Sequence, residues 1–302
     1  MSPGRAKSDV PWGAFVDQLH SHDGAGAGVD RLIGLGAGRP RWVHRFAAIH
    51  DDVPLEDLEA IAGRGVTPMI TLEPWIPGAG VEQPDFTLDR ILNGCLDDDL
   101  RRWALGLAAW SRPVLLRFAH EMNGHWYPWA VGANGNTSDE YRRTWRHTRS
   151  LFDASGANNL QWVWSPNITT TDAADFSETF PGNEHIDVLG IDGYNWGDGS
   201  GDGWRSPEEI FAADLRDLAR LGQQPILVTE VACAEDPDPK RKPVWISQLA
   251  SLAAARGRVH GFIWFDVHKE RDWRIDSSPE SAAAFAAAVV SRERSTRELG
   301  CT

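Results

Sequence analysis

Strand-like and helix-like segments alternate along the whole chain, and this alternation constrains the fold more than any other feature. Eight runs rich in Val, Ile, Leu and Trp are each followed by a helical or connecting segment. These runs span residues 11–16, 40–49, 67–75, 113–123, 160–167, 186–196, 224–232 and 259–268. Nearly continuous apolar runs indicate strands buried on both faces, as in parallel sheets covered by helices. The pattern therefore predicts a single (β/α)8 TIM barrel of the α/β class.

A closed barrel also has no edge strands, whereas a doubly wound open sheet would have to protect two. We expect one catalytic domain over residues 1–302, with a core from about residue 11 to 290 and a frayed tail at 291–302. Within it, residues 91–110 are expected to form one helical segment. A capped first turn is expected at Ser138–Tyr141, and the weakest helical pattern is at 29–35.

Composition and charge exclude several kinds of partner. The chain has 30 Lys and Arg against 43 Asp and Glu, a formal net charge of −13, which disfavours nucleic acid as a partner. No apolar run approaches the roughly 20 residues of a membrane span. Residues 1–16 contain no apolar signal core, so the sequence predicts no membrane partner and leaves open whether the native protein is secreted. We expect a monomer.

Cysteine content points to reduced thiols. The three cysteines, Cys95, Cys233 and Cys301, are too few and too scattered for a disulfide framework or a zinc cluster.

Polar and aromatic residues gather where the predicted strands end. The carboxyl ends of barrel strands form the face that carries chemistry. The residues at these ends are His50, Asp51, Glu73, Trp75, His120, Glu121, Asn123, Trp164, Asn167, Asp192, Tyr194, Trp196, Glu230, Trp264, Asp266 and His268. The opposite ends carry mostly Pro, Gly, Gln and Thr. One rim of the barrel is therefore the predicted active face.

Two glutamates stand out because each ends an apolar strand-like run. Glu121 follows "PVLLRFAH" and Glu230 follows "QPILVT". Strand alternation puts Glu121 on the face of Arg117, and Glu230 on the face of Val228, so both could point toward the barrel axis. Either glutamate alone could be a solvated rim residue or half of an ion pair, but two at the fourth and seventh strands favour a site.

Two carboxyl groups that face each other across a cleft can catalyse the cleavage of a glycosidic bond. Groups about 5 to 5.5 Å apart act as nucleophile and acid/base, whereas about 6.5 to 9.5 Å leaves room for a water molecule and gives inversion. The sequence alone does not define this distance.

Tryptophans are abundant and have two expected roles. Four on helical segments are expected in the core: Trp103, Trp110, Trp145 and Trp245. Five at strand ends or in rim loops are candidate platforms for sugar rings: Trp75, Trp126, Trp129, Trp196 and Trp264.

No metal or cofactor is expected. His120 and His125 are five residues apart, which does not match the HExxH spacing of a zinc helix. The segment 195–204 holds two aspartates among glycines but lacks the spacing of an EF-hand loop. It is expected to form a loop over the site, with calcium binding as the lesser alternative.

Four motifs together resemble glycoside hydrolase family 26, and the likeness extends from about residue 11 to 290. They are "RFAHEMNGHWYPW" at 117–129, "GIDGYNW" at 190–196, "PILVTEVA" at 225–232 and "GFIWFD" at 261–266. The resemblance implies a retaining mechanism with Glu121 as acid/base and Glu230 as nucleophile. It also implies that Tyr194 hydrogen-bonds the nucleophile and that His120, Trp126, Tyr194 and Trp264 line the site of the cleaved sugar.

The expected function is therefore a retaining endo-β-glycanase acting on a polysaccharide or oligosaccharide, with β-1,4-mannan as the first substrate. Mixed-linkage β-glucan and β-1,3-xylan stay open because "HWYPWA" differs from the aromatic sequence of the best-known mannan-cleaving members. A non-catalytic sugar-binding barrel and a metal-dependent hydrolase are the alternatives from other classes. His120 and Asn123 are expected to orient sugar hydroxyls or Glu121, while Glu73, His125 and His268 have no assigned role.

Overall fold

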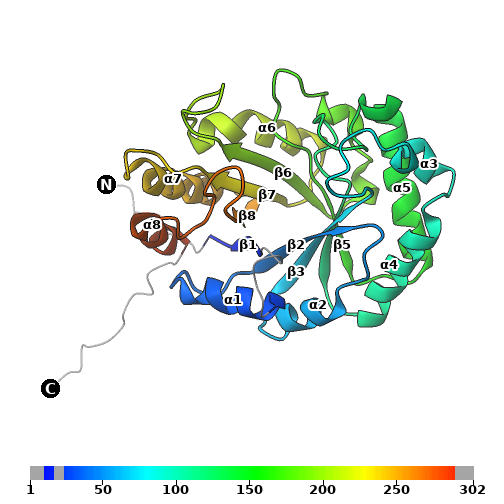
Figure 1. Ribbon diagram of the computed structural model, residues 1–302, viewed down its shortest axis with the longest axis horizontal. Coiled ribbons are helices and arrows are strands. Elements are labelled where there is room, and N and C mark those ends of the chain that lie inside the picture. Colours follow the sequence, from blue (N-terminus) through cyan, green and yellow to red (C-terminus); the bar gives the residue numbers. More distant parts are fainter. Residues whose placement is uncertain (1–9, 17–23, 290–302) are drawn as a thin grey trace.

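The computed structural model describes residues 10–16 and 24–289, and within them eight parallel strands close into a barrel in the order β1 to β8 (Figure 1). Pairing of β1 with β8, from Trp12 opposite Phe262 to Val16 opposite Asp266, completes the closure. The strands are β1 (Trp12–Val16), β2 (Trp42–Ala48), β3 (Thr67–Glu73), β4 (Val114–Phe118), β5 (Leu160–Trp164), β6 (Val188–Asn195), β7 (Ile226–Cys233) and β8 (Val259–Asp266). The predicted (β/α)8 TIM barrel is confirmed.

Helices surround the barrel, as Figure 1 shows. The α-helices are α1 (Gly24–Gly34), α2 (Leu55–Ala62), α3 (Leu88–Leu92), α4 (Asp97–Trp110), α5 (Ser138–Ala154), α6 (Pro207–Leu221), α7 (Arg241–Ala255) and α8 (Pro279–Val289). Short 3-10 helices are η1 (Pro84–Phe86), η2 (Ala133–Gly135), η3 (Phe176–Thr179) and η4 (Asn183–His185). None of the helices in the described ranges is long and apolar enough to cross a membrane. The predicted tail at 291–302 and Cys301 lie outside the described residues.

Two local predictions were wrong. The segment 91–110 is not one helix, because the chain turns between α3 and α4, where Gly94 has a φ of +81°. Helix α4 then starts afresh at three aspartates, whose charges suit the positive end of the helix dipole. The cap of α5 is Thr137 rather than Ser138, since the Thr137 hydroxyl accepts from the Glu140 N–H and the Glu140 carboxylate accepts from the Thr137 N–H.

The lower half of the barrel interior is an apolar plug. Seven strands contribute one residue each: Trp42, Met69, Leu115, Val163, Val188, Leu227 and Ile263. Strand β1 contributes Gly13 because a Cβ there would lie 2.6 Å from the carbonyl oxygen of Trp42. The plug leaves the barrel open to chemistry only at its carboxyl end.

Packing outside the barrel buries most of the helical tryptophans. Trp103, Trp145 and Trp245 are fully buried, as predicted. Trp110 is half-buried, and its indole donates to the Glu59 carboxylate at 3.3 Å. Cys95 and Cys233 are free thiols, in agreement with the prediction for these two residues.

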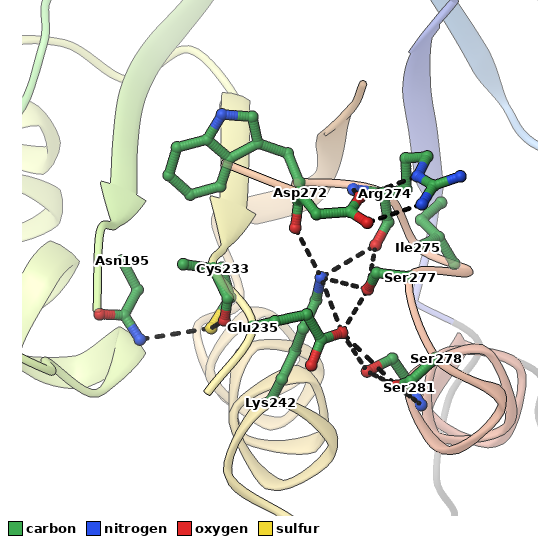
Figure 2. Close-up of polar contacts among 12 residues, drawn as sticks. Asn195, Cys233, Glu235, Lys242, Asp272, Arg274, Ile275, Ser277, Ser278 and Ser281 are labelled. Carbon is green, nitrogen blue, oxygen red and sulfur yellow. Dashed lines mark hydrogen bonds and ion pairs between the residues drawn. The ribbon is translucent and has the colours of Figure 1, made fainter. Parts of the chain in front are cut away.

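A buried lysine ties the loop after β8 to the start of α7 (Figure 2). The Lys242 ammonium, with a fully buried side chain, donates to the carbonyls of Asp272 and Arg274 at 3.3 and 2.9 Å and to the Ser277 hydroxyl at 2.7 Å. The Glu235 carboxylate lies 3.4 Å away and balances the charge. A lysine in the first turn of a helix opposes the helix dipole, so its place here is explained by these tertiary contacts.

We predict that Lys242→Ala lowers the free energy of unfolding by about 3 kcal/mol, because it leaves two buried carbonyls and a carboxylate without their cation. Equilibrium unfolding in urea measures the change. The exposed Lys240, two residues earlier, is the matched control, and its replacement by Ala should change the value by less than about 0.5 kcal/mol. Equal effects of the two substitutions would contradict the role of Lys242 in holding the loop after β8.

Candidate active site

A buried guanidinium lies directly above the apolar plug. Arg117 on β4 is fully buried, and its Nε donates to the Thr71 hydroxyl at 2.7 Å. One terminal nitrogen donates to Asp192 Oδ2 at 2.6 Å, and the other makes a short hydrogen bond to Glu230 Oε1. Because the guanidinium is a rigid planar fork, these three bonds define the position of both carboxylates.

Glu230 reaches this site through an irregularity in β7. Residues Ile226 and Val228 belong to the core between barrel and helices, so the predicted alternation of Ile226, Val228 and Glu230 on one face is wrong. The pairing of β6 with β7 passes from Ile191–Val228 to Asp192–Glu230, which leaves Thr229 as an extra residue. This bulge lets both Thr229 and Glu230 face the interior.

The Glu230 carboxylate is held at both oxygens. Oε1 accepts from Arg117, and Oε2 accepts from the hydroxyl of Tyr194 on β6. His120 Nε2 lies 3.8 Å from Oε1. The prediction that Tyr194 hydrogen-bonds Glu230 is confirmed. A carboxylate fixed in this way presents a defined face to a ligand above it.

Glu121 lies in a turn after β4, and not within a strand as Glu230 does. Strand β4 ends at Phe118, and the next residues leave the extended conformation: Ala119 has a φ of +42° and Glu121 a φ of +51°. Such values are uncommon for residues other than glycine and often mark functional sites. The turn is held by the Glu121 N–H, which donates to the carbonyl of Ser165 at 2.8 Å. Side-chain direction is therefore set by this turn and not by strand alternation.

The environment of Glu121 differs from that of Glu230. Its side chain is buried, and Oε2 accepts from the Trp126 indole at 2.7 Å. Burial, together with the charges of Asp192 and Glu230, raises the pKa of Glu121 well above its ordinary value. Gly124 makes the indole contact possible, because a Cβ there would lie 2.5 Å from the Trp126 ring. The site thus holds one buried carboxyl group with a raised pKa beside one bonded to a guanidinium.

His120 and Tyr127 form the wall between the two glutamates. The Tyr127 hydroxyl lies 3.2 Å from His120 Nε2, and Tyr127 stacks on Trp129 with ring centroids 4.3 Å apart. Burial and the charges of Glu121, Glu73 and Glu230 raise the pKa of Tyr127 well above its ordinary value. Tyr127 was not among the predicted site residues, although it lies within the fourth-strand motif at 117–129. Trp129 is fully buried behind Tyr127, so its prediction as a sugar platform is wrong.

Trp264 was predicted to line the site, and the structure corrects this. It is fully buried and packs against Trp245 of α7 and Phe285 of α8, with ring centroids 6.1 and 5.7 Å away. On β8 it is Ile263 and Phe265 that face the interior, so the residue between them must face the helices.

Two other aromatic residues, Phe265 and Trp273, contact Tyr194 on the side of the site where Trp264 was expected. Phe265 stacks on Phe15 at 4.9 Å and makes an edge contact with Tyr194. Trp273, from the loop held by Lys242, packs against Tyr194 at 5.4 Å and Trp196 at 4.9 Å. Trp196 is 38% exposed, and its role as a sugar platform stays a prediction.

Asn123 joins the loops after β4 and β5. Its side chain is fully buried, its amide nitrogen donates to the Asn167 carbonyl at 2.8 Å, and its amide oxygen accepts from the Asn167 N–H at 2.9 Å. Its predicted role in orienting sugar hydroxyls or Glu121 stays a prediction.

A third carboxyl group, Glu73, lies one layer above Thr71 on the inward face of β3. It ends β3, is 6% exposed, and accepts from the indole of Trp75 at 3.2 Å. Burial raises the pKa of Glu73 to about 8, with the Trp75 bond and the Arg117 charge opposing and the Glu230 charge adding to the rise. Trp75 is half-buried and makes edge contacts with Tyr127 and Trp129.

Other polar rim residues serve structural contacts. His50 pairs with Asp99 at 3.2 Å, and the Asp51 carboxylate accepts from the Ala48 N–H at 2.8 Å. Asp266 accepts from the Ile275 N–H at 2.7 Å. His125 and His268 are exposed, and His125 contacts Trp126 by its edge.

One group in the described part of the chain has suitable spacing for a metal ion. Ligand atoms of His120, Asp192 and Glu230 lie within 4.8 Å of one another. Arg117, however, already donates to both of these carboxylates, so its positive charge occupies the place where a cation would be needed. The donor set of His120, Asp192 and Glu230 therefore favours the guanidinium over a metal ion.

In the loop at 197–203, where calcium was the lesser alternative, Asp198 pairs with Arg241 at 2.5 Å.

Comparisons with known proteins show which proteins this chain is similar to. The sequence model described as Glycosyl hydrolase family 26 matches residues 80–224. Endoglucanase H of Acetivibrio thermocellus is 35% identical over 237 residues, which cover 76% of this chain and 25% of that protein. A mannan endo-1,4-beta-mannosidase of Bifidobacterium adolescentis is 35% identical over 92 residues, 30% of this chain and 9% of that protein. The chain thus spans a quarter or less of these two relatives.

Solved structures agree on the fold. The YdhT protein from Bacillus subtilis superimposes with a TM-score of 0.70 at 20% identity, covering 93% of this chain and 86% of that one.

We predict that Glu73→Gln stabilises the protein increasingly as the pH rises from 5 to 8. The folded state holds the Glu73 proton up to a pH of about 8, whereas the unfolded chain releases it near the ordinary value of 4.5. Each pH unit between these values lowers the free energy of unfolding of the wild type by up to about 1.4 kcal/mol relative to a glutamine, which does not titrate.

Thermal melts of both proteins across this pH range measure the difference. Glu56→Gln, at an exposed position on α2, is the control and should give a constant difference. A Glu73→Gln difference that is the same at pH 5 and pH 8 would contradict the assignment.

Proposed function

Because this chain belongs to glycosyl hydrolase family 26, we propose that it is a retaining endo-β-glycanase that cleaves a β-linked polysaccharide. One observation carries the proposal: two buried glutamates share a site but have opposite electrostatic surroundings. Glu230 is bonded to the Arg117 guanidinium, while Glu121 is buried against an indole near other carboxylates. Such a pair suits a nucleophile and a general acid in one step.

In the proposed mechanism Glu230 attacks the anomeric carbon while Glu121 donates its proton to the leaving oxygen. Arg117 and Tyr194 hold the attacking carboxylate in place, so little reorientation is needed during the reaction. In the second step Glu121, now ionised, takes a proton from water, which attacks the glycosyl-enzyme. Retention requires the two carboxyl groups to lie about 5 to 5.5 Å apart, which is our expectation here.

The substrate is proposed as β-1,4-mannan, which the resemblance implies and the name of the Bifidobacterium adolescentis relative supports. A second candidate, β-glucan, is favoured by a specific observation. Endoglucanase H aligns with 76% of this chain, against 30% for the mannosidase. Initial rates on purified mannan, mixed-linkage β-glucan and β-1,3-xylan separate these possibilities, and binding without release of reducing sugar on any of them would favour a sugar-binding barrel.

We predict that the first product formed is the β-anomer. A double displacement inverts the anomeric centre twice, so the configuration of the substrate is kept. Proton NMR during the first minutes of hydrolysis, before mutarotation, detects the anomer directly. Immediate appearance of the α-anomer would show a single inversion and would remove Glu230 from the role of nucleophile.

We also predict that azide distinguishes the two glutamates. With an aryl glycoside whose leaving group needs no proton, Glu121→Ala should still form the glycosyl-enzyme on Glu230, and azide should convert it to the β-glycosyl azide. Glu230→Ala should form no such intermediate, and azide in place of the carboxylate should give the α-glycosyl azide. Exchange of the two anomers between the variants would mean that the roles are reversed.

A further inference from the structure

We propose that Glu73 is a further substrate-binding residue, whose carboxyl group hydrogen-bonds a hydroxyl of the sugar ring held between Glu121 and Glu230. The inference rests on the proposed function, since it assigns a third carboxyl group to the same glycan site. The family motifs gave Glu73 no role, and the retaining mechanism does not use it.

Strand alternation aims Glu73 into the site. On β3, Met69 belongs to the apolar plug and Thr71 accepts a bond from Arg117 in the layer above. Residues two apart on a strand share a face, so Glu73 lies one layer higher on the same inward face. The Glu73 carbonyl accepts from the Ile49 N–H at 2.8 Å, which holds the end of this strand against the loop after β2. Its side chain thus comes from a fixed backbone.

Glu73 borders the same space as the two catalytic candidates. The Glu73 carboxylate accepts from the Trp75 indole at 3.2 Å, and that indole makes an edge contact with Tyr127 with ring centroids 5.2 Å apart. The Tyr127 hydroxyl lies 3.2 Å from His120 Nε2, which in turn is 3.8 Å from a Glu230 oxygen. A sugar ring seated for attack by Glu230 therefore lies within reach of Tyr127, and Glu73 stands on the adjoining wall.

The carboxyl group has bonding capacity left for a ligand. Oε2 accepts from the Trp75 indole, and no hydrogen bond reaches Oε1 from any residue within 10–16 or 24–289. The side-chain hydrogen bonds of Arg117 go to Thr71, Asp192, Glu230 and His44, and none goes to Glu73 from within the described ranges. A nearly buried carboxyl group with one free oxygen beside a glycan site is well placed to bond a hydroxyl.

Burial of the Glu73 carboxyl group lowers the free energy of unfolding, which argues that Glu73 has a functional role. No cation bonds Glu73 in the described chain, and Lys269, whose charge acts on it, is 64% exposed. An unpaired carboxyl group loses its hydration on burial, whereas an amide or an apolar side chain would lose less. The raised pKa of Glu73 keeps it neutral, so it can donate as well as accept.

A structural role through Trp75 is the competing explanation. Glu73 could serve only to orient the indole, which contacts Tyr127 and Trp129. Trp75→Phe separates the two explanations, because it removes the indole N–H and keeps an aromatic ring. If Glu73 acts only through Trp75, the Phe variant should reproduce the defect of Glu73→Ala.

The test compares Glu73→Ala, Glu73→Gln and Trp75→Phe with the wild type and with Glu56→Ala, at an exposed position on α2. The substrates are the 2,4-dinitrophenyl β-glycosides of cellobiose and mannobiose, whose leaving group needs no proton, so Glu121 drops out of the first step. We expect kcat/KM to fall about 10- to 100-fold in Glu73→Ala, to fall by a smaller factor in Trp75→Phe, to stay within about fivefold of wild type in Glu73→Gln, and to be unchanged in Glu56→Ala. Trapping of Glu230 by the 2-deoxy-2-fluoro analogues, followed by mass spectrometry, checks that each variant retains its nucleophile.

Calorimetric titration of cellotetraose and mannotetraose into the same variants, in a Glu121→Gln background, tests the contact without turnover. Affinity should fall at least tenfold in Glu73→Ala for the tetraose that binds. Wild-type rates in Glu73→Ala, or equal defects in Glu73→Ala and Trp75→Phe, would overturn the proposal and leave the proposed function intact. If the wild type hydrolyses nothing, the proposed function fails, and the titration still decides whether Glu73 binds sugar.

Discussion

The buried guanidinium of Arg117 is the interaction on which the site depends. It carries one positive charge into the barrel interior and distributes it over Thr71, Asp192 and Glu230. Removing any one of these acceptors would leave the guanidinium partly unpaired, and removing the guanidinium would leave two carboxylates facing each other without a cation. The polar layer is therefore stable only as a unit, and it needs the apolar plug beneath it to exclude water from below.

One guanidinium cannot neutralise every carboxyl group around it, and this shortage separates their behaviour. Asp192 and Glu230 receive direct bonds from Arg117, whereas Glu121 and Glu73 receive only indole N–H groups. Burial raises the pKa values of Glu121 and Glu73, and it also raises the pKa of Asp192 to about 7, although Arg117 bonds it. The unequal placement of a single positive charge therefore gives the carboxyl groups of one small space different bonding partners.

How much of this could be predicted from sequence depends on whether the backbone is regular. The barrel follows from alternating apolar strands and helices, and the strand-end position of Glu121 and Glu230 follows from the same pattern. Their directions do not, because Glu230 depends on a bulge at Thr229 and Glu121 on positive φ values after β4. The alternation argument pointed both glutamates inward, but through a regular geometry that neither strand has.

The errors at single residues have the same origin. Trp264 was misplaced because neighbouring residues on β8 face opposite sides, and the indole belongs to the helix-facing set. The bond between the Asn123 amide and the backbone of Asn167, a partner 44 residues away, is likewise a contact that no local pattern indicates. Residue type at a strand end is thus informative about chemistry, while side-chain direction needs the packed structure.

The aromatic wall on the β6–β8 side connects the site to a region far from it. Trp273 packs on Tyr194, which donates to Glu230, and the loop that carries Trp273 is held by Lys242 through the carbonyls of Asp272 and Arg274. A buried ammonium bonded to carbonyls on both sides of Trp273 limits how far that ring can move. In the proposed mechanism the Glu230 carboxylate must be positioned closely for its attack, so loosening this loop should affect Tyr194 and Glu230 before Arg117, whose side-chain hydrogen bonds within 10–16 and 24–289 go to residues of the barrel strands.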